Sequence, residues 1–295
     1  MARERGVTND NYSRIPAPIS RLGKAALLSP RRLTASRRRL PDFLVIGTQR
    51  GGTTSLYRHL VAHPQVESAT PSKGVHYFDK EPDKSLNWYR AHFPLARDGG
   101  PISGEGAPYY LFHPLVPARV ADALPDVRVI AMLRDPVERA YSAYKQEYAR
   151  GFEDADTFER ALELEPERLD GEEERMIKHP AYQSYNHQHH AYVGRGRYLE
   201  QLTAWRAHVP AERMLVLQTE RFSADPAAGM CDVFTFLGLE PVIEDSYRKH
   251  NARLSADMNP ATREQLAATF AEPNRRLYEY LGEDFGWSQP GVAAT

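Results

Sequence analysis

A run of apolar residues passes directly into a glycine-rich turn between Phe43 and Tyr57, and the segment reads FLVIGTQRGGTTSLY. The first four residues suit a strand buried on both faces of a parallel sheet. From Thr53 onward, Leu56 and Leu60 recur at helical spacing. The turn therefore joins the carboxyl end of a strand to the N-terminus of a helix, where backbone N–H groups and the helix dipole favour an anion. The segment predicts an α/β fold with a phosphate-binding loop.

The composition of this loop supports an anion site. Glycine lacks the β-carbon that keeps an anion away from backbone N–H groups, and hydroxyl side chains add further donors. The predicted phosphate ligands are the loop's cation, two of its glycines and three hydroxyl residues: Arg50, Gly51, Gly52, Thr53, Thr54 and Ser55.

The loop differs from that of nucleotide-hydrolysing proteins, which reads G-x-x-x-x-G-K-[ST]. Gly47 and Gly52 keep the glycine spacing, but Thr53 stands at the lysine position and the loop's cation is Arg50. An arginine stays charged and presents a planar fork of donors that suits a phosphate oxygen. The next apolar run also ends in Arg134 rather than in an acid that would hold magnesium. A P-loop phosphotransferase is therefore a disfavoured alternative.

A second strand, turn and helix follow at residues 127–142. The apolar run VRVIAML is followed by Arg134 and then by Asp135, a favourable N-cap, with proline at the first helical position and Glu138 completing a capping box. Arg134 ends the strand and Ser142 lies about two turns into the helix. We expect both side chains to converge on one anion at the carboxyl edge of the sheet.

The segments GTQRGGTT and LRDPVERAYSAY resemble the two signature segments of the sulfotransferases that use 3′-phosphoadenosine 5′-phosphosulfate (PAPS), particularly the heparan sulfate N- and O-sulfotransferase branch and its bacterial relatives. The resemblance runs from Asp42 to Trp287 in family order. It includes KGVHYFD, NWYRAHFP, GEGAPYYLFHP, GRYLEQLTAW and EPNRRLYEYLGEDFGW.

The resemblance implies a P-loop-like three-layer fold, with a central, mostly parallel sheet flanked by helices. It implies in-line transfer of a sulfuryl group, without metal, from PAPS to a hydroxyl or amine of a carbohydrate or glycan-like acceptor. In the family the first segment holds the 5′-phosphosulfate, while residues like Arg134 and Ser142 hold the 3′-phosphate. Arg197 and Tyr198, which fall on the GRY match, are expected to help close over the nucleotide.

Two departures from the heparan sulfotransferase pattern concern the chemistry. Arg50 replaces the usual lysine, so its role narrows to electrostatic stabilisation of the leaving phosphate. Gly74 stands where many of these enzymes carry a glutamate that acts as base. His76 is then the first candidate for the base and Glu105 the second. The missing glutamate also keeps open a catalytically silent protein that binds PAPS or its product, 3′-phosphoadenosine 5′-phosphate (PAP).

The N-terminal region differs in charge from the rest of the chain. Residues 1–41 hold ten cationic and two acidic side chains, a net charge of +8, which leaves −9 for the remainder of a chain whose net charge is −1. Its prolines and serines favour a flexible basic arm. We therefore predict an arm at residues 1–41 and one sulfotransferase domain at residues 42–295. Within that domain, we expect helices at residues 260–281 to be interrupted at Pro273.

The remaining features bear on compartment, metals and partners. Cys231 is the lone cysteine and no apolar run has the length of a bilayer span, so we expect a soluble cytoplasmic protein that binds a small-molecule or glycan acceptor and no nucleic acid. Neighbouring histidines invite a metal site, but no cysteines or well-spaced carboxylates accompany them, and we predict none. The acceptor cleft or its lid is the expected place for this run: His187, His189 and His190. The sequence does not indicate an oligomeric state.

Overall fold

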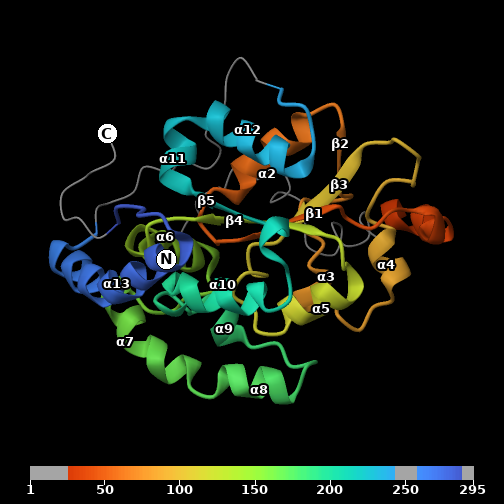
Figure 1. Ribbon diagram of the computed structural model, residues 1–295. Coiled ribbons are helices and arrows are strands. Elements are labelled where there is room, and N and C mark those ends of the chain that lie inside the picture. Colours follow the sequence, from red (N-terminus) through yellow and green to blue (C-terminus); the bar gives the residue numbers. More distant parts are fainter. Residues whose placement is uncertain (1–25, 243–257, 288–295) are drawn as a thin grey trace, which may run out of the picture.

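The computed structural model describes residues 26–242 and 258–287, which form a sheet covered by helices on both faces (Figure 1). The sheet has five strands, all parallel, in the order β2-β3-β1-β4-β5. The strands are β1 (Phe43–Gly47), β2 (Val66–Ser68), β3 (Ile102–Gly106), β4 (Arg128–Leu133) and β5 (Met214–Gln218).

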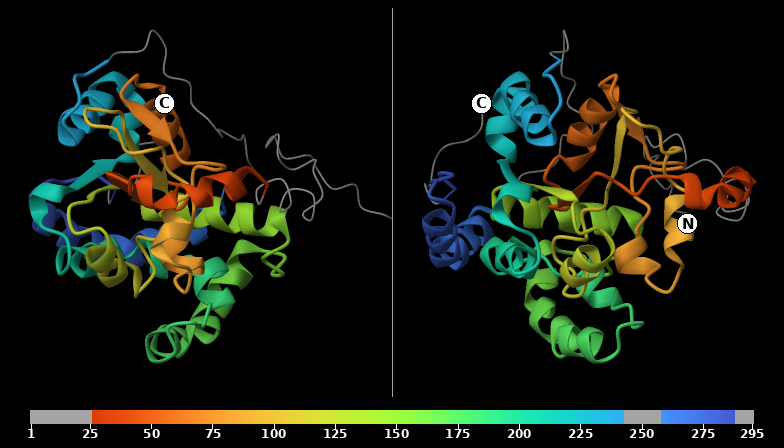
Figure 2. Two further views of the ribbon diagram at one scale, coloured as in Figure 1. Left: turned by 90° about the vertical axis from the view of Figure 1, so that its right-hand side faces the viewer. Right: turned by 45° about the vertical axis from the view of Figure 1, so that its right-hand side comes forward.

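Helices connect the strands and extend the layer on one face. In chain order they are η1 (Ala35–Arg37), α2 (Thr53–Ala62), α3 (Tyr77–Lys80), α4 (Leu86–Arg90), α5 (Val116–Ala123), α6 (Pro136–Arg150), α7 (Phe158–Leu169), α8 (Glu172–Lys178), α9 (Tyr185–His189), η2 (Gly194–Gly196), α10 (Tyr198–Arg206), η3 (Ala211–Arg213), α11 (Thr219–Ala224), α12 (Pro226–Leu237) and α13 (Pro260–Leu281). Helices α7 to α9 lie on the opposite side of the sheet from α2 and α12 in every view (Figure 2).

Alternation along the central strand builds two separate cores. Phe43 and Val45 pack into the apolar cluster of α2, α11 and α12, whereas Leu44 and Ile46 pack into the cluster of α5, α10 and α13. All four side chains are fully buried, because a parallel sheet between two helical layers exposes neither face. The predicted three-layer α/β fold is confirmed.

The strand order places a topological switch point between β1 and β4. From β1 the chain runs outward to β2 on one side, and from β4 it runs to β5 on the other. Adjacent parallel strands whose connections leave in opposite directions form a switch point, where ligands bind beyond the carboxyl ends of the strands. The loop after β1 is fixed there, because the Thr48 N–H donates to the Met132 carbonyl at 2.8 Å. Both predicted anion-binding segments begin at this point.

Two local expectations need correction. α13 runs unbroken through Pro273, although proline removes one helical hydrogen bond, because Phe270 and Leu277 bury the surrounding turns. Asp135 does cap α6 by accepting from the N–H groups of residues 137 and 138, but the reciprocal capping-box bond is replaced. The Asp135 N–H donates instead to Glu220 of α11 at 3.0 Å.

The described part of the predicted N-terminal arm packs on the domain. Arg31 Nε donates to the Ala91 carbonyl at 2.7 Å, and Arg38 Nη1 donates to the Phe93 carbonyl at 2.9 Å. Residues 26–41 thus lie against α4 and the segment after it, so packed structure begins before the boundary drawn at residue 42. The first 25 residues of the predicted arm lie outside the described residues. None of the described helices combines the length and apolar character needed to cross a bilayer.

Candidate active site

The two predicted anion-binding segments touch at the switch point. Arg50 Nε donates to Ser142 Oγ of α6 at 2.8 Å, and Arg50 Nη1 donates to Gln146 Oε1 at 2.8 Å. Arg134 Nη1 in turn donates to the Arg50 carbonyl at 3.1 Å. Arg50 therefore contacts both Ser142 and Arg134, although the three residues are far apart in the sequence.

The backbone of the first loop requires its glycines. A β-carbon on Gly51 would lie 2.6 Å from the Met132 carbonyl oxygen, which is closer than real side chains approach. Gly52 has a φ of 86° and forms the N-cap of α2, a left-handed conformation that favours glycine. Thr53, Thr54 and Ser55 follow as the first turn of the helix. The loop thus lies close against β4, and its hydroxyl residues surround the positive end of α2.

Lys73 reaches this helix N-terminus from the neighbouring loop and was not among the predicted site residues. Its Nζ lies 3.2 Å from the hydroxyl oxygens of both Thr53 and Thr54. Burial, with a smaller contribution from the charge of Arg58, lowers the pKa of Lys73 to about 7. The only sequence signal was the cation that opens the KGVHYFD stretch, because no spacing rule links position 73 to the loop 20 residues earlier.

His76 and Asp79 form a histidine–carboxylate pair beside this lysine. His76 Nδ1 lies 2.8 Å from Asp79 Oδ2; the carboxylate has no exposed surface, whereas the imidazole is 32% exposed. A buried carboxylate holds the proton on Nδ1, which leaves the Nε2 lone pair free to accept a proton. A β-carbon on Gly74 would lie 3.2 Å from this Nε2 and 2.9 Å from the Gly106 carbonyl oxygen. Gly74 therefore makes room for the His76 ring.

Glu105 is fully buried beneath this pair, and both of its oxygens accept hydrogen bonds. Oε1 accepts from the hydroxyls of Tyr89 at 2.7 Å and Tyr110 at 2.8 Å, while Oε2 accepts from the N–H groups of Val75 at 2.5 Å and His76 at 3.2 Å. Burial raises the pKa of the carboxyl, while the hydrogen bonds lower it. This geometry suits a carboxylate that fixes the backbone of residues 75–76, and it does not favour direct contact with an acceptor.

The two residues of the GRY match lie differently. Tyr198 is buried, and its hydroxyl donates to the Arg134 carbonyl at 2.7 Å, so it fixes the second anion-binding segment. Burial raises the pKa of this phenol, which stays protonated and remains a donor. Arg197 is exposed at the start of α10. The structure places Tyr198, but not Arg197, in direct contact with the other predicted ligands.

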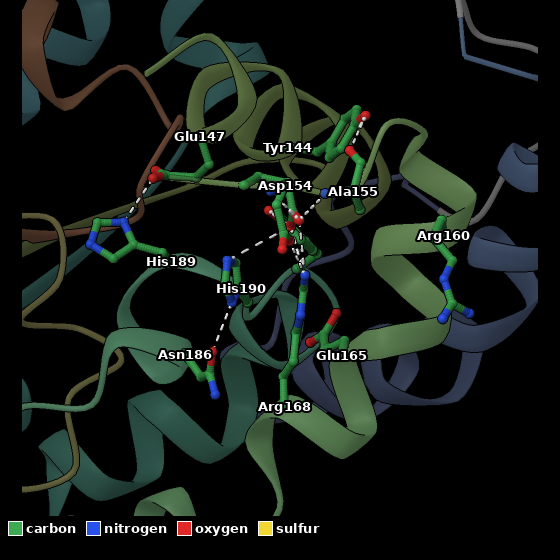
Figure 3. Close-up of polar contacts among 12 residues, drawn as sticks. Tyr144, Glu147, Asp154, Ala155, Arg160, Glu165, Arg168, Asn186, His189 and His190 are labelled. Atoms are coloured by element: carbon green, nitrogen blue, oxygen red, sulfur yellow. Dashed lines mark hydrogen bonds and ion pairs between the residues drawn. The ribbon is translucent and has the colours of Figure 1, made fainter. Parts of the chain in front are cut away.

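The histidine run is hydrogen-bonded to neighbouring side chains. His189 Nδ1 lies 2.8 Å from Glu147 Oε2, and His190 Nδ1 lies 2.9 Å from Asn186 Oδ1 (Figure 3). Glu147 Oε1 accepts from the side-chain amide of Gln49 in the first loop at 2.7 Å. A polar chain therefore links the phosphate-binding loop to α9 through α6. His187 belongs to a separate contact, 2.8 Å from the Tyr109 hydroxyl.

Comparison with known proteins gives the family of the chain. A family model described as a sulfotransferase domain matches residues 40–259, about three quarters of the chain. Heparan sulfate glucosamine 3-O-sulfotransferase 3A1 of Homo sapiens is 29% identical over 289 residues, which cover 90% of this chain and 66% of that protein. Heparan sulfate glucosamine 3-O-sulfotransferase 6 of Mus musculus is 28% identical over 283 residues, with 85% and 75% covered. The chain thus spans just under two thirds of the human relative.

Solved structures give the same grouping. The crystal structure of a sulfotransferase from Alicyclobacillus acidocaldarius superposes with a TM-score of 0.67 at 30% identity, and the match covers 85% of this chain and all of that one. The sulfotransferase resemblance and the P-loop-like fold predicted from the sequence are confirmed. On the family match, the two joined anion-binding segments and this structural likeness, the chain belongs to the sulfotransferase domain family.

Proposed function

We propose that this protein transfers a sulfuryl group from PAPS to a hydroxyl or amine of a glycan-like acceptor, by in-line displacement without a metal. The observation that carries the proposal is the contact between the two anion-binding segments, in which Arg50 bonds to Ser142 and Arg134 bonds to the Arg50 carbonyl. The glycan-like acceptor is supported by the names of the relatives, which are heparan sulfate glucosamine 3-O-sulfotransferases.

The donor is held by groups that already surround the switch point. The first-loop backbone and the hydroxyls of Thr53 and Thr54 suit the 5′-phosphosulfate, while Arg134 and Ser142 suit the 3′-phosphate. Donor binding then replaces the bond between Arg50 and Ser142, which frees the guanidinium for a phosphate oxygen. Arg197 lies at the surface, where it can close over the nucleotide.

Fixed donors replace the magnesium that a kinase needs. The transferred sulfuryl group carries less charge than a γ-phosphoryl group, so preorganised cations and N–H groups suffice to stabilise the departing phosphate. Arg50, Arg134 and Lys73 supply the cations here, and the helix N-terminus of α2 adds positive potential. This arrangement supports sulfuryl transfer over the P-loop phosphotransferase alternative.

The base that activates the acceptor is His76. Its Nε2 is free to accept the proton while Asp79 stabilises the imidazolium that forms. Glu105 holds the His76 backbone from below. This division of roles also disfavours a silent binding protein, because a buried carboxylate that orients a partly exposed imidazole suits proton transfer rather than nucleotide binding. A cytoplasmic location and the absence of nucleic-acid partners stay predictions.

Isothermal titration tests the donor site. Wild-type protein is expected to bind PAP tightly and ATP weakly, and Arg50→Ala and Arg134→Ala are each expected to weaken PAP binding by about 10- to 100-fold, because each removes a charge-assisted hydrogen bond. Arg206→Ala, an exposed arginine at the end of α10, is the matched control and should leave the affinity unchanged. Equal affinity of both site variants and wild type for PAP would refute the assignment.

Mass spectrometry with PAPS, a panel of glycan acceptors and EDTA then tests transfer. One added sulfate on an acceptor in the presence of EDTA is the expected result, because no step uses a metal. PAP binding without transfer to any acceptor would favour the silent binding protein. A strict magnesium requirement would instead favour phosphoryl transfer.

The His76 pair is tested by turnover. His76→Ala is expected to lower turnover by about 10²- to 10⁴-fold at saturating acceptor, the usual contribution of a positioned base. Asp79→Asn should lower turnover as well, since an amide at position 79 no longer favours a proton on Nδ1 of His76. The exposed His208 gives the control variant His208→Ala; near-normal turnover of His76→Ala would remove the residue from this role.

Glu105 is tested by separating stability from turnover. Glu105→Gln is expected to lower the free energy of unfolding by about 1–3 kcal/mol, because the introduced amide nitrogen would face hydrogen-bond donors instead of accepting from them. Denaturant unfolding measures this change, with Glu67→Gln on the exposed edge of β2 as control. A variant as stable as the control whose turnover still collapses would assign Glu105 to the chemistry.

A further inference from the structure

Lys73 places an ammonium group where the departing phosphate comes to lie. Its Nζ is 3.2 Å from the hydroxyl oxygens of Thr53 and of Thr54, at the first turn of α2. Those hydroxyls flank the proposed site of the 5′-phosphosulfate. A cation beside both hydroxyls therefore lies next to that proposed site.

The end of β3 is shaped around the Lys73 side chain. Gly106 lies under the stem of the lysine, and a β-carbon there would lie 2.8 Å from Lys73 Cε and 3.3 Å from Cγ. The Gly106 N–H also donates to the Lys73 carbonyl at 2.9 Å. A side chain at position 106 would require the lysine stem to shift, so the glycine leaves the space that this conformation of Lys73 occupies.

Lys73 can donate a proton near neutral pH, whereas Arg50 cannot. A guanidinium stays charged throughout and does not release a proton at neutral pH. The Arg50 fork is also directed at Ser142 and Gln146 of α6. Burial, by contrast, brings the pKa of Lys73 to about 7 when no donor is bound. A bound polyanion favours the charged form and raises this pKa, so the ammonium is protonated when the donor is in place.

We propose that Lys73 is the general acid of the reaction. The acceptor oxygen or nitrogen forms a bond to sulfur as the bond between sulfur and the 5′-phosphate oxygen breaks, and the electron pair of the broken bond passes to that oxygen. His76 Nε2 takes the proton of the acceptor, and Lys73 gives a proton to the phosphate oxygen. Lys73 then takes up a proton from solvent, and His76 releases the proton of the acceptor to solvent. Over one turnover, the proton lost by the acceptor is balanced by the proton gained by the phosphate. This inference rests on the proposed sulfuryl transfer.

Two substitutions test the transferable proton of Lys73 separately from its positive charge. Lys73→Met keeps most of the side-chain volume and removes both, whereas Lys73→Arg keeps the charge and removes the available proton. We expect both variants to lower turnover by about 10²-fold or more, the usual contribution of a general acid. Lys73→Arg should retain PAP affinity within a few-fold. Lys178→Met, at the exposed end of α8, is the matched control and should retain full turnover.

Proton uptake on PAP binding gives a readout that does not depend on activity. Calorimetry near pH 8 in buffers of different ionisation enthalpy measures the protons taken up with PAP. Lys73 is partly neutral above its pKa of about 7, so binding draws a proton onto it. Wild type and Lys178→Met should therefore take up more protons than Lys73→Met. Gly106→Ala should reduce both proton uptake and turnover, because its β-carbon requires the Lys73 stem to shift. This variant serves if Lys73→Met does not fold.

The outcomes separate this inference from the proposed function. Turnover of Lys73→Arg within threefold of wild type, or equal proton uptake by wild type and Lys73→Met, would overturn the acid role while leaving sulfuryl transfer intact. Failure of wild-type protein to bind PAP would instead remove the proposed function itself.

Discussion

The site depends on the meeting of two loops at one point of a parallel sheet. β1 and β4 are neighbours whose connections leave in opposite directions, so the segments that follow them have nowhere to lie except beside each other. The hydrogen bond from Arg50 to Ser142 joins the two segments at this point. Under the proposed function, one ligand that carries an anionic group at each end engages both segments.

Three glycines shape the site because they lack a β-carbon. Gly51 lets the first loop lie against β4, Gly74 leaves space for the His76 ring, and Gly106 leaves space for Lys73. The glycine at position 74 removes the carboxylate expected from the family resemblance, and the same vacancy admits an imidazole oriented by Asp79.

Local sequence rules predicted the fold and the donor loops because each depends on neighbouring residues: apolar strands, glycine spacing and the Asp135 cap. They failed where a distant element decides. Glu220 of α11 supplies the cap expected from Glu138, and packing of Phe270 and Leu277 carries α13 through Pro273. Lys73 was missed for the same reason, since its partners lie across β3. A titratable group whose role is set by contacts beyond its own segment leaves little signal in the sequence around it.

An arginine in the first loop changes what the rest of the site must supply. A loop lysine can hold the phosphate and also release a proton to it, whereas Arg50 only holds it. In this chain the two tasks are divided between residues on different loops. Arg50 supplies the permanent charge at the switch point, and Lys73, packed over Gly106, supplies the exchangeable proton. Because burial sets the proton affinity of Lys73 and the bound donor raises it, the acid is charged when the phosphate is present to receive its proton. Division of the two tasks therefore allows the loop cation to become arginine without the loss of general-acid catalysis.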